Sequence, residues 1–244
     1  MAGAKRFFVE NIRVGETFEL TGDEFEHARN VLRLCVGDEA ILLDNSGKEF
    51  SAIVTEVKKK TLLFNVVRES QGEREAKTPT ALAFGYLKNA DKNEFIVQKA
   101  VELGVKKIVA FSSEYSSAYM NENKLERLNK VSKEAAKQCL RSVAPQVEYA
   151  EDLESALCKL SEFENKLFAC EFSETSERDI REIVGSTAIV VGSEGGFSKA
   201  EADLAKANGF SLISLGKRIL RAETAAVALT SIVMFALGEM ESCV

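Results

Sequence analysis

Alternating apolar and polar residues dominate the first third of the chain and predict a small β domain. Strand-like runs separated by turn signals lie at residues 6–9, 17–20, 39–43, 50–57 and 61–67. Short strands at such regular intervals are typical of a β-barrel. Turns are expected at 44–47 and 58–60. A helix opened by Thr21, with Glu24 three residues later as a capping box, is expected between the second and third strands.

From residue 80 the pattern changes to strands that alternate with helices, which indicates βαβ units and a parallel sheet. Strands are expected at 81–86, 108–111, 167–170, 188–191 and 211–215, and helices at 91–103, 123–140 and 222 to about 239. Asp91 and Glu94 have the spacing of a capping box for the first of these helices. The polar, unpatterned segment 69–79 predicts a linker. We therefore expect an α/β fold with two domains, residues 1–72 and 73–244.

Two glycine-bearing loops, residues 192–198 and 215–221, form the strongest candidate for a binding site. Each follows an apolar run typical of a buried parallel strand and then leads into a helix. Ser198 and Glu201 have capping-box spacing, so the first loop is a strand-to-helix turn. The paired Gly195 and Gly196 permit positive φ and close approach of a ligand to the backbone. We expect both loops to line one pocket, at the carboxyl ends of the strands.

The residues exclude several common kinds of site. With one histidine and five scattered cysteines, none in a C-x-x-C pair, no metal site is expected and the thiols are expected to be reduced. Ser193 lacks the glycine two residues earlier that a hydrolase nucleophile elbow requires. Lys217 is followed by Arg218 rather than Ser or Thr, so the second loop is not a Walker phosphate loop. A pocket lined by backbone and flanked by arginine and glutamate remains.

The charge and hydropathy of the chain restrict the partners and the location that we expect. The formal net charge of −6 argues against binding nucleic acid by bulk electrostatics, so RNA binding would need a local basic patch. The longest apolar run, residues 225–237, is shorter than the roughly 20 residues of a membrane span. No secretory signal is recognisable. A cytoplasmic protein without a membrane partner is expected.

The two loops, Val191-Gly-Ser-Glu-Gly-Gly-Phe-Ser198 and Leu215-Gly-Lys-Arg-Ile-Leu-Arg-Ala-Glu-Thr-Ala225, resemble the paired signatures of SPOUT methyltransferases. They are most similar to those of the RsmE family, which methylates N3 of a uridine in 16S ribosomal RNA of the small subunit. Segments 27–33, 92–104 and 134–141 also resemble this family, so the likeness covers nearly the whole chain. It implies a PUA-like barrel joined to an α/β domain with a trefoil knot, in a homodimer. The apolar last helix would supply part of the subunit interface.

The resemblance implies that S-adenosylmethionine (SAM) is held by three loops of the knot. Glycines and apolar walls suit a nucleoside cofactor that is bound mainly through backbone groups. The expected cofactor-binding residues are Ala169, Cys170, Gly192, Ser193, Glu194, Gly195, Gly196, Leu215, Gly216, Arg218, Ile219 and Leu220.

Arg221, Glu223 and Glu194 are the candidate catalytic residues. Arginine stays protonated in proteins, so Arg221 is expected to orient the uracil or its phosphate and to stabilise negative charge on the carbonyl oxygens. Glu194 and Glu223 are the carboxylates of the signature loops. Either is a candidate for accepting the N3 proton, or for holding a loop by accepting backbone hydrogen bonds.

A set of basic residues in the barrel and near the first α/β strand is expected to bind RNA, although each also suits an ordinary surface or salt-bridge role. These residues are Arg6, His27, Arg29, Arg33, Lys88, Lys92 and Arg141. The chain departs from the family at three positions: Ser193 replaces a proline, Leu140 replaces a glycine, and a basic residue is missing near Val143. Methylation of a ribose 2′-hydroxyl or of transfer RNA, and non-catalytic RNA binding, are the alternative functions.

Overall fold

The computed structural model of the chain describes residues 5–171 and 177–240. The chain forms two compact units. The first contains Met1–Glu75 and Ala136–Ala144, and the second contains Ala76–Ala135 and Pro145–Val244. Segment 136–144 thus groups with the first unit although it lies far along the chain.

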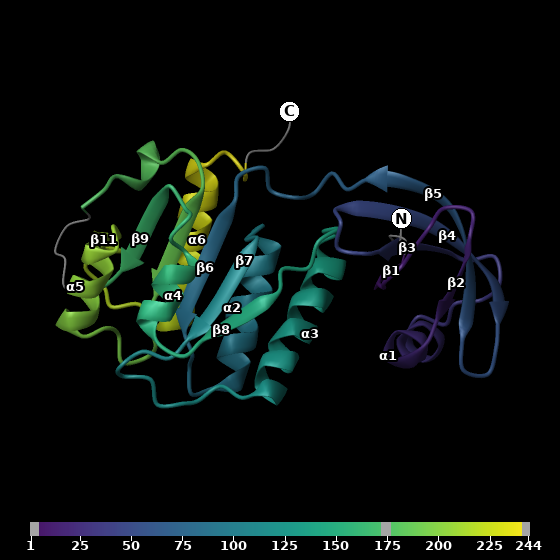
Figure 1. Cartoon of the computed structure of the whole chain (residues 1–244), viewed down its shortest axis with the longest axis horizontal. Helices are drawn as coiled ribbons and strands as arrows, with labels where there is room; N and C mark the ends of the chain where they lie inside the picture. The colour runs from purple at the N-terminus through teal and green to yellow at the C-terminus, as the bar shows by residue number, and fades with distance from the viewer. Residues whose placement is uncertain (1–4, 172–176, 241–244) are drawn as a thin grey trace. The chain divides into compact units, whose positions relative to one another are not determined.

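Five strands of the first unit form one sheet (Figure 1). They are β1 (Lys5–Phe8), β2 (Thr17–Leu20), β3 (Glu39–Leu43), β4 (Lys48–Val57) and β5 (Leu62–Gln71), in the order β1-β3-β4-β5-β2. β1 is parallel to β3 and the other neighbours are antiparallel. Both predicted turns, at 44–47 and 58–60, join antiparallel neighbours. Apolar residues such as Phe50, Phe64 and Val66 alternate along β4 and β5, so one face of the sheet is buried.

The predicted helix of this unit is short and changes type. α1 (Gly22–Glu26) runs into a π-helix (His27–Val31), in which the backbone N–H of Leu32 donates to the carbonyl of His27 over 3.0 Å. Thr21 precedes α1, but its side chain makes no capping hydrogen bond. The expected Thr21 capping box is therefore wrong. π-Helical turns are rare and occur often at functional sites.

The second unit contains the predicted parallel sheet, with one strand more than expected. Its strands are β6 (Thr80–Gly85), β7 (Lys107–Phe111), β8 (Val147–Ala150), β9 (Asn165–Ala169), β10 (Thr187–Val191) and β11 (Ser211–Ile213). They lie in the order β11-β9-β10-β6-β7-β8, all parallel. β6 and β10 are buried along their whole length. Continuous apolar strands of this kind occur where both faces of a sheet are covered.

Helices cover this sheet (Figure 1). α2 (Ala90–Glu102) packs against α6 (Ala222–Ala236), which contacts β6 and β10. α4 (Leu153–Lys159) contacts β7, β8 and α5 (Lys199–Ala207), and α3 (Glu122–Gln138) is the longest of the helices in the described residues. Phe197 belongs to the apolar core of this unit. Its ring stacks on that of Phe111 with centroids 6.3 Å apart and packs on that of Phe168 with centroids 4.1 Å apart.

Sequence pattern alone missed β8, α4 and a short 3₁₀ turn (Ile180–Glu182). It also misplaced one cap, because α2 is capped by Asn89, whose side-chain oxygen accepts from the backbone N–H of Asp91 at 2.9 Å. The predicted Asp91–Glu94 capping box is thus wrong, and Glu94 instead binds Arg127 through two hydrogen bonds of 2.9 and 3.0 Å.

The chain leaves α3 through a Schellman motif with leucine at its left-handed position. Leu140 has φ +64°. The backbone N–H of Arg141 donates to the carbonyl of Ala136 at 2.9 Å, and that of Leu140 to Lys137 at 3.3 Å. Glycine is the usual residue at this position because it has no Cβ. The departure from the family at Leu140 therefore falls where glycine is conformationally favoured.

Candidate active site

The three predicted cofactor loops begin side by side at one edge of the parallel sheet. Ala169 at the end of β9 is in register with Val191 at the end of β10 and with Ile213 at the end of β11. The loops that follow these strands therefore start at the same level, at the carboxyl edge of the sheet (Figure 1). The structure thus brings together the segments that the sequence proposes for one pocket.

The glycine loop after β10 is a tight turn that leads into α5. The backbone N–H of Gly196, at φ +68°, donates to the carbonyl of Ser193 over 3.0 Å. Ser198 caps α5, and its hydroxyl and the Glu201 carboxylate form the predicted capping box. Paired glycines and a capped helix fix the loop backbone, so its amide and carbonyl groups are pre-positioned for a ligand.

The glycine loop packs so tightly against neighbouring segments that side chains could not replace two glycines. A Cβ on Gly85, at the end of β6, would lie 2.4 Å from the backbone nitrogen of Ser193. A Cβ on Gly195 would lie 2.5 Å from the Cβ of Tyr115. The Ser193 hydroxyl is buried 3.2 Å from that of Ser113. Ser193 therefore fits the space where the family has proline and gains a polar partner there.

The loop after β11 is open to solvent. Gly216 has φ +92°, and a Cβ there would meet no atom within 4 Å. Ile219 is 87% exposed, while Leu215 and Leu220 are half-buried and Arg218 is exposed. An exposed backbone beside apolar side chains suits a ligand with a flat, partly apolar ring.

Glu194 holds a loop. Its Oε1 accepts a hydrogen bond from the backbone N–H of Lys88 at 3.1 Å, which connects the glycine loop to the segment between β6 and α2. The ammonium group of Lys88 is left to solvent at an exposed position. Of the two roles predicted for Glu194, the geometry shows backbone hydrogen bonding.

Glu223 and Arg221 lie at the start of α6. Arg221 is the N-cap residue and is exposed. Glu223 forms a 3.0 Å ion pair with Lys92 of α2. Burial raises the pKa of Glu223, but hydrogen bonds from Lys92 and its own backbone N–H, together with the charges of Lys92 and Arg221, leave the pKa below its ordinary value. The carboxylate is therefore ionised at neutral pH and is a weak base. Its ion pair neutralises part of the charge that Lys92 could offer to RNA.

Asn93 supports the site and was not found by sequence reasoning. It is fully buried in α2. Its side-chain oxygen accepts from the backbone N–H of Leu87 at 2.8 Å, and its NH₂ donates to the carbonyls of Leu87 at 2.9 Å and Asn89 at 3.0 Å. Asn93 thus holds in place the segment between β6 and α2 that contacts Glu194. The available sequence signal for this residue was a polar side chain within the apolar stripe of a helix.

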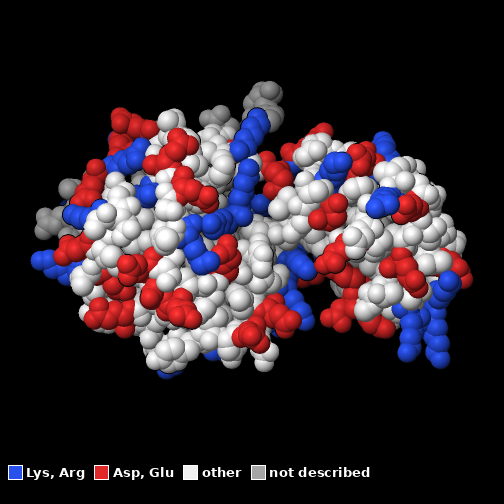
Figure 2. Space-filling model, viewed as in Figure 1, with Lys and Arg blue, Asp and Glu red and all other residues white. Residues whose placement is uncertain are grey.

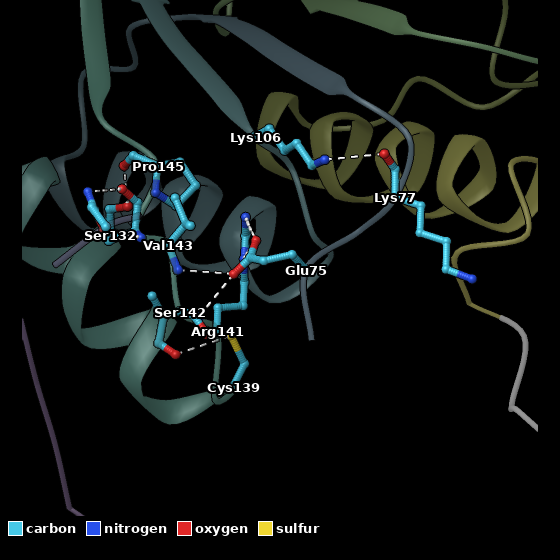
Figure 3. A network of polar contacts seen from close by, with 12 residues as sticks. Glu75, Lys77, Lys106, Ser132, Cys139, Arg141, Ser142, Val143 and Pro145 are labelled. Carbon is cyan, nitrogen blue, oxygen red and sulfur yellow. Dashed lines mark hydrogen bonds and ion pairs between the residues drawn. The ribbon is translucent and has the colours of Figure 1, made fainter. Parts of the chain in front are cut away.

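Two residues expected to bind RNA, Arg6 and Arg141, are buried in ion pairs within the first unit. Arg6 is 8% exposed and lies 2.6 Å from Glu49. Arg141 is 3% exposed and binds Glu75 through Nε at 3.0 Å and NH2 at 2.8 Å. Figure 3 shows Glu75 also accepting from the backbone N–H of Ser142 and Val143, each at 3.0 Å. Both guanidinium groups hold the fold and do not face solvent.

The other basic candidates of this unit lie around the π-helix. His27 is half-buried where α1 becomes the π-helix, and Arg29 and Arg33 are exposed. Arg33 has a left-handed backbone with φ +55°. Arg29 does not extend freely into solvent, because its NH1 donates to the carbonyls of Lys58 and Lys59.

Over residues 5–171 and 177–240, no group of three or more His, Cys, Asp or Glu side chains is placed to hold a metal ion. In the same residues, no helix has the length and apolar character needed to cross a bilayer.

Comparison with known proteins agrees with this geometry. Residues 74–234 match the model of an RNA methyltransferase domain, and residues 20–67 match an RNA methyltransferase PUA domain. Ribosomal RNA small subunit methyltransferase E of Bacillus subtilis is 31% identical over 239 residues, covering 91% of this chain and 92% of the relative. The chain belongs to the RsmE family.

Two solved structures are similar to this chain over nearly its whole length. The enzyme from Neisseria gonorrhoeae, bound to S-adenosyl methionine, has a TM-score of 0.89 at 30% identity and covers 98% of this chain and 100% of its own. A putative methyltransferase from Legionella pneumophila in complex with SAM has a TM-score of 0.86 at 28% identity, with 96% and 98% covered. The predicted α/β fold with a PUA-like N-terminal domain is confirmed.

Proposed function

We propose that this RsmE-family protein transfers a methyl group from SAM to N3 of a specific uridine in 16S ribosomal RNA. Family membership and the SAM-bound structures of relatives support the cofactor and the class of RNA. The observation that carries the proposal is the in-register end of β9, β10 and β11, which gathers the signature loops at one edge. The finer choice of uracil N3 follows from the family resemblance of those loops.

The residues present fit SAM. Backbone groups at Ala169, Cys170, Gly192 to Gly196 and Gly216 would bind the nucleoside, with Leu215, Ile219 and Leu220 as apolar walls and Arg218 at the rim. The open space at Gly216 leaves its backbone accessible to a ligand, and Gly195 is exposed in the glycine turn. When bound, SAM supplies an electrophilic methyl group on a positively charged sulfur. The protein must place uracil N3 in line with that group, and positioning supplies much of the rate.

Arg221 is proposed to act on the uracil. Its guanidinium is exposed at the N-terminus of α6, beside the loop after β11. Negative charge develops on uracil O2 and O4 as N3 loses its proton, and a fixed cation stabilises that charge. Arg221→Ala is expected to lower kcat by about 10²–10³-fold. The dissociation constant of SAM should change little, which isothermal calorimetry would check; unchanged kcat would contradict this role.

The proton acceptor is tested by comparing two changes at Glu194. Glu194→Gln keeps an oxygen that accepts from Lys88 but removes the basic carboxylate. If Glu194 holds the loop, as its 3.1 Å hydrogen bond supports, the Gln variant keeps near-normal methyl transfer. Glu194→Ala should weaken SAM binding severalfold, because the Lys88 N–H loses its partner. A large loss of kcat in the Gln variant, with SAM binding intact, would instead identify Glu194 as the base.

A homodimer and a trefoil knot complete the proposal; both rest on the resemblance, and the dimer rests also on the apolar last helix. For the dimer, α6 exposes two large apolar side chains, Ile232 by 44% and Phe235 by 67%. A second copy of this chain would cover them. Light scattering at micromolar concentration tests this, and a monomer there would contradict it.

The decisive experiment is methyl transfer from labelled SAM to small ribosomal subunits that lack the modification. Mass spectrometry of the product nucleosides should identify N3-methyluridine. A 2′-O-methylated nucleoside, or methylation of transfer RNA alone, would support the second enzymatic function. SAM binding without transfer to subunits or naked RNA would mean another RNA target.

A further inference from the structure

The turn between β4 and β5 carries three consecutive lysines that project into solvent. Lys58, Lys59 and Lys60 are all exposed, and the turn is closed by a 2.9 Å hydrogen bond from the Lys58 N–H to the carbonyl of Thr61. In Figure 2, blue side chains extend from the lower right of the molecule, where this turn lies in Figure 1. We call these three residues the lysine turn.

Arg29 holds the lysine turn against the π-helix. Its NH1 group donates to the carbonyl of Lys58 at 3.1 Å and to that of Lys59 at 2.9 Å. Its guanidinium also lies 5.8 Å from the ring centroid of the buried Phe25. An arginine that donates to two carbonyls of one turn restricts that turn, so the lysine ammonium groups are presented from an ordered backbone.

The charge around the turn is mostly unneutralised. Lys58 has a long ion pair of 3.6 Å with Glu56, whereas among the described residues Lys59 and Lys60 form none. Arg33 adds an exposed cation at the end of the π-helix. The nearby acid Glu26 is hydrogen-bonded to Asn30. In a chain of net charge −6, a local excess of cations on an ordered turn is the feature that a polyanion would recognise.

We propose that the lysine turn is an anchor for the phosphate backbone of the RNA substrate, with Arg29 as the positioning residue. This inference rests on the proposed function, because it assigns part of the RNA footprint of the same enzyme. Lysine binds phosphate as a flexible point charge and carries no base preference, so the anchor raises affinity without choosing the nucleotide. The direct contacts are assigned to the lysines, since NH1 of Arg29 already donates to two carbonyls of the turn.

The test measures how RNA affinity depends on salt. Each phosphate contact by a cation contributes about 0.7 to 0.9 to the slope of log K against log salt. The triple variant Lys58→Gln, Lys59→Gln, Lys60→Gln should lower that slope by about 2. It should weaken binding of a small-subunit RNA fragment by about a hundredfold at 0.1 M salt, if the two affinities converge at about 1 M salt. Urea unfolding followed by circular dichroism should show unchanged stability, which would exclude misfolding of the first unit as the cause. Calorimetry should show unchanged SAM affinity, which would show that the second unit is intact.

A matched variant controls for total charge. Lys77, Lys130 and Lys133 are exposed lysines of the second unit, and changing all three to Gln removes the same charge. This control should keep most of the wild-type slope. Equal losses in both variants would mean a general charge effect and would overturn the anchor.

Arg29→Met separates positioning from direct contact. It keeps the apolar packing on Phe25 but loses both hydrogen bonds to the turn. Affinity should fall while the slope drops by less than in the triple lysine variant. An unchanged slope in the triple variant overturns the proposal, as does loss of binding to anionic vesicles with RNA binding intact. If the wild type modifies another nucleotide or RNA, the proposed function fails, but the lysine comparison still decides the anchor on that RNA.

Discussion

Removing the side chain of Asn93 should loosen the proposed cofactor site, because this side chain holds the segment that contacts the glycine loop. The residue is fully buried, and its three hydrogen bonds of 2.8, 2.9 and 3.0 Å end on the backbone of Leu87 and Asn89. Two residues before and one after Leu87, the same segment contacts the glycine loop, through Gly85 against Ser193 and through the Lys88 N–H to Glu194. Asn93→Ala would therefore disturb the position of the glycine loop through this segment, and not through a direct contact with SAM.

The expected cost is large. Three hydrogen bonds at about 1 kcal/mol each set a floor near 3 kcal/mol. The N–H and carbonyl of the buried Leu87 would also lose partners, and each unpaired buried group adds about 1 kcal/mol or more. We expect Asn93→Ala to lower the free energy of unfolding of the second unit by roughly 3–5 kcal/mol and to weaken SAM binding.

Urea unfolding followed by circular dichroism, together with calorimetric titration of SAM, measures both effects. Asn208→Ala is a suitable control in the same unit, because Asn208 is exposed and its side chain donates one hydrogen bond of 2.9 Å to Leu204. It should cost less than about 1 kcal/mol and leave SAM binding unchanged. If Asn93→Ala resembled this control, the segment would be held by other contacts and the reasoning would be refuted.

Two further predictions concern the first unit. Leu140→Gly should raise the free energy of unfolding by about 0.5–1 kcal/mol in urea, because the left-handed φ of +64° no longer strains a Cβ. Leu140→Ala keeps the Cβ and should give no such gain. Equal gains in both variants would contradict the strain argument. Burial raises the pKa of Glu49, but hydrogen bonds from Arg6 and Ser142 and the charge of Arg6 leave it lowered. This stabilisation is present above the unfolded pKa of about 4.3 and is lost as pH falls through the folded pKa. Urea midpoints measured from pH 7 to pH 3 should fall less steeply in Glu49→Gln than in the wild type, and parallel curves would contradict it.

The fold was largely predictable because its signals are local. β2 and β3 were placed at their observed bounds by alternation and turn residues, and the capping box of Ser198 and Glu201 marked the start of α5 correctly. The strand-to-helix position of the glycine loop was also predicted from local sequence, since glycines after an apolar strand need only their neighbours to be interpreted. Its part in cofactor binding stays a prediction. β8 was missed because it is short and lies at the edge of the sheet, with half-buried Glu148 and Tyr149.

The fate of the charged residues could not be predicted, because their partners lie far away in sequence. Glu49 is 43 residues from Arg6, and Glu75 is 66 residues from Arg141. Nothing near either arginine indicates that it will be buried. Removing one member of such a pair would leave the other charge buried without its partner, which is strongly destabilising.

Ion pairs with carboxylates therefore determine which basic side chains of the described residues remain available to contact RNA. Glu49, Glu75 and Glu223 each bind a basic residue that the sequence offered as an RNA contact, namely Arg6, Arg141 and Lys92. What remains for a polyanion are the exposed cations at the loop edges, including Arg221 and the lysine turn. Each ion pair removes one acid and one base, so the net charge of −6 remains on the groups left over. RNA binding by this chain therefore depends on places where exposed cations gather locally, such as the lysine turn.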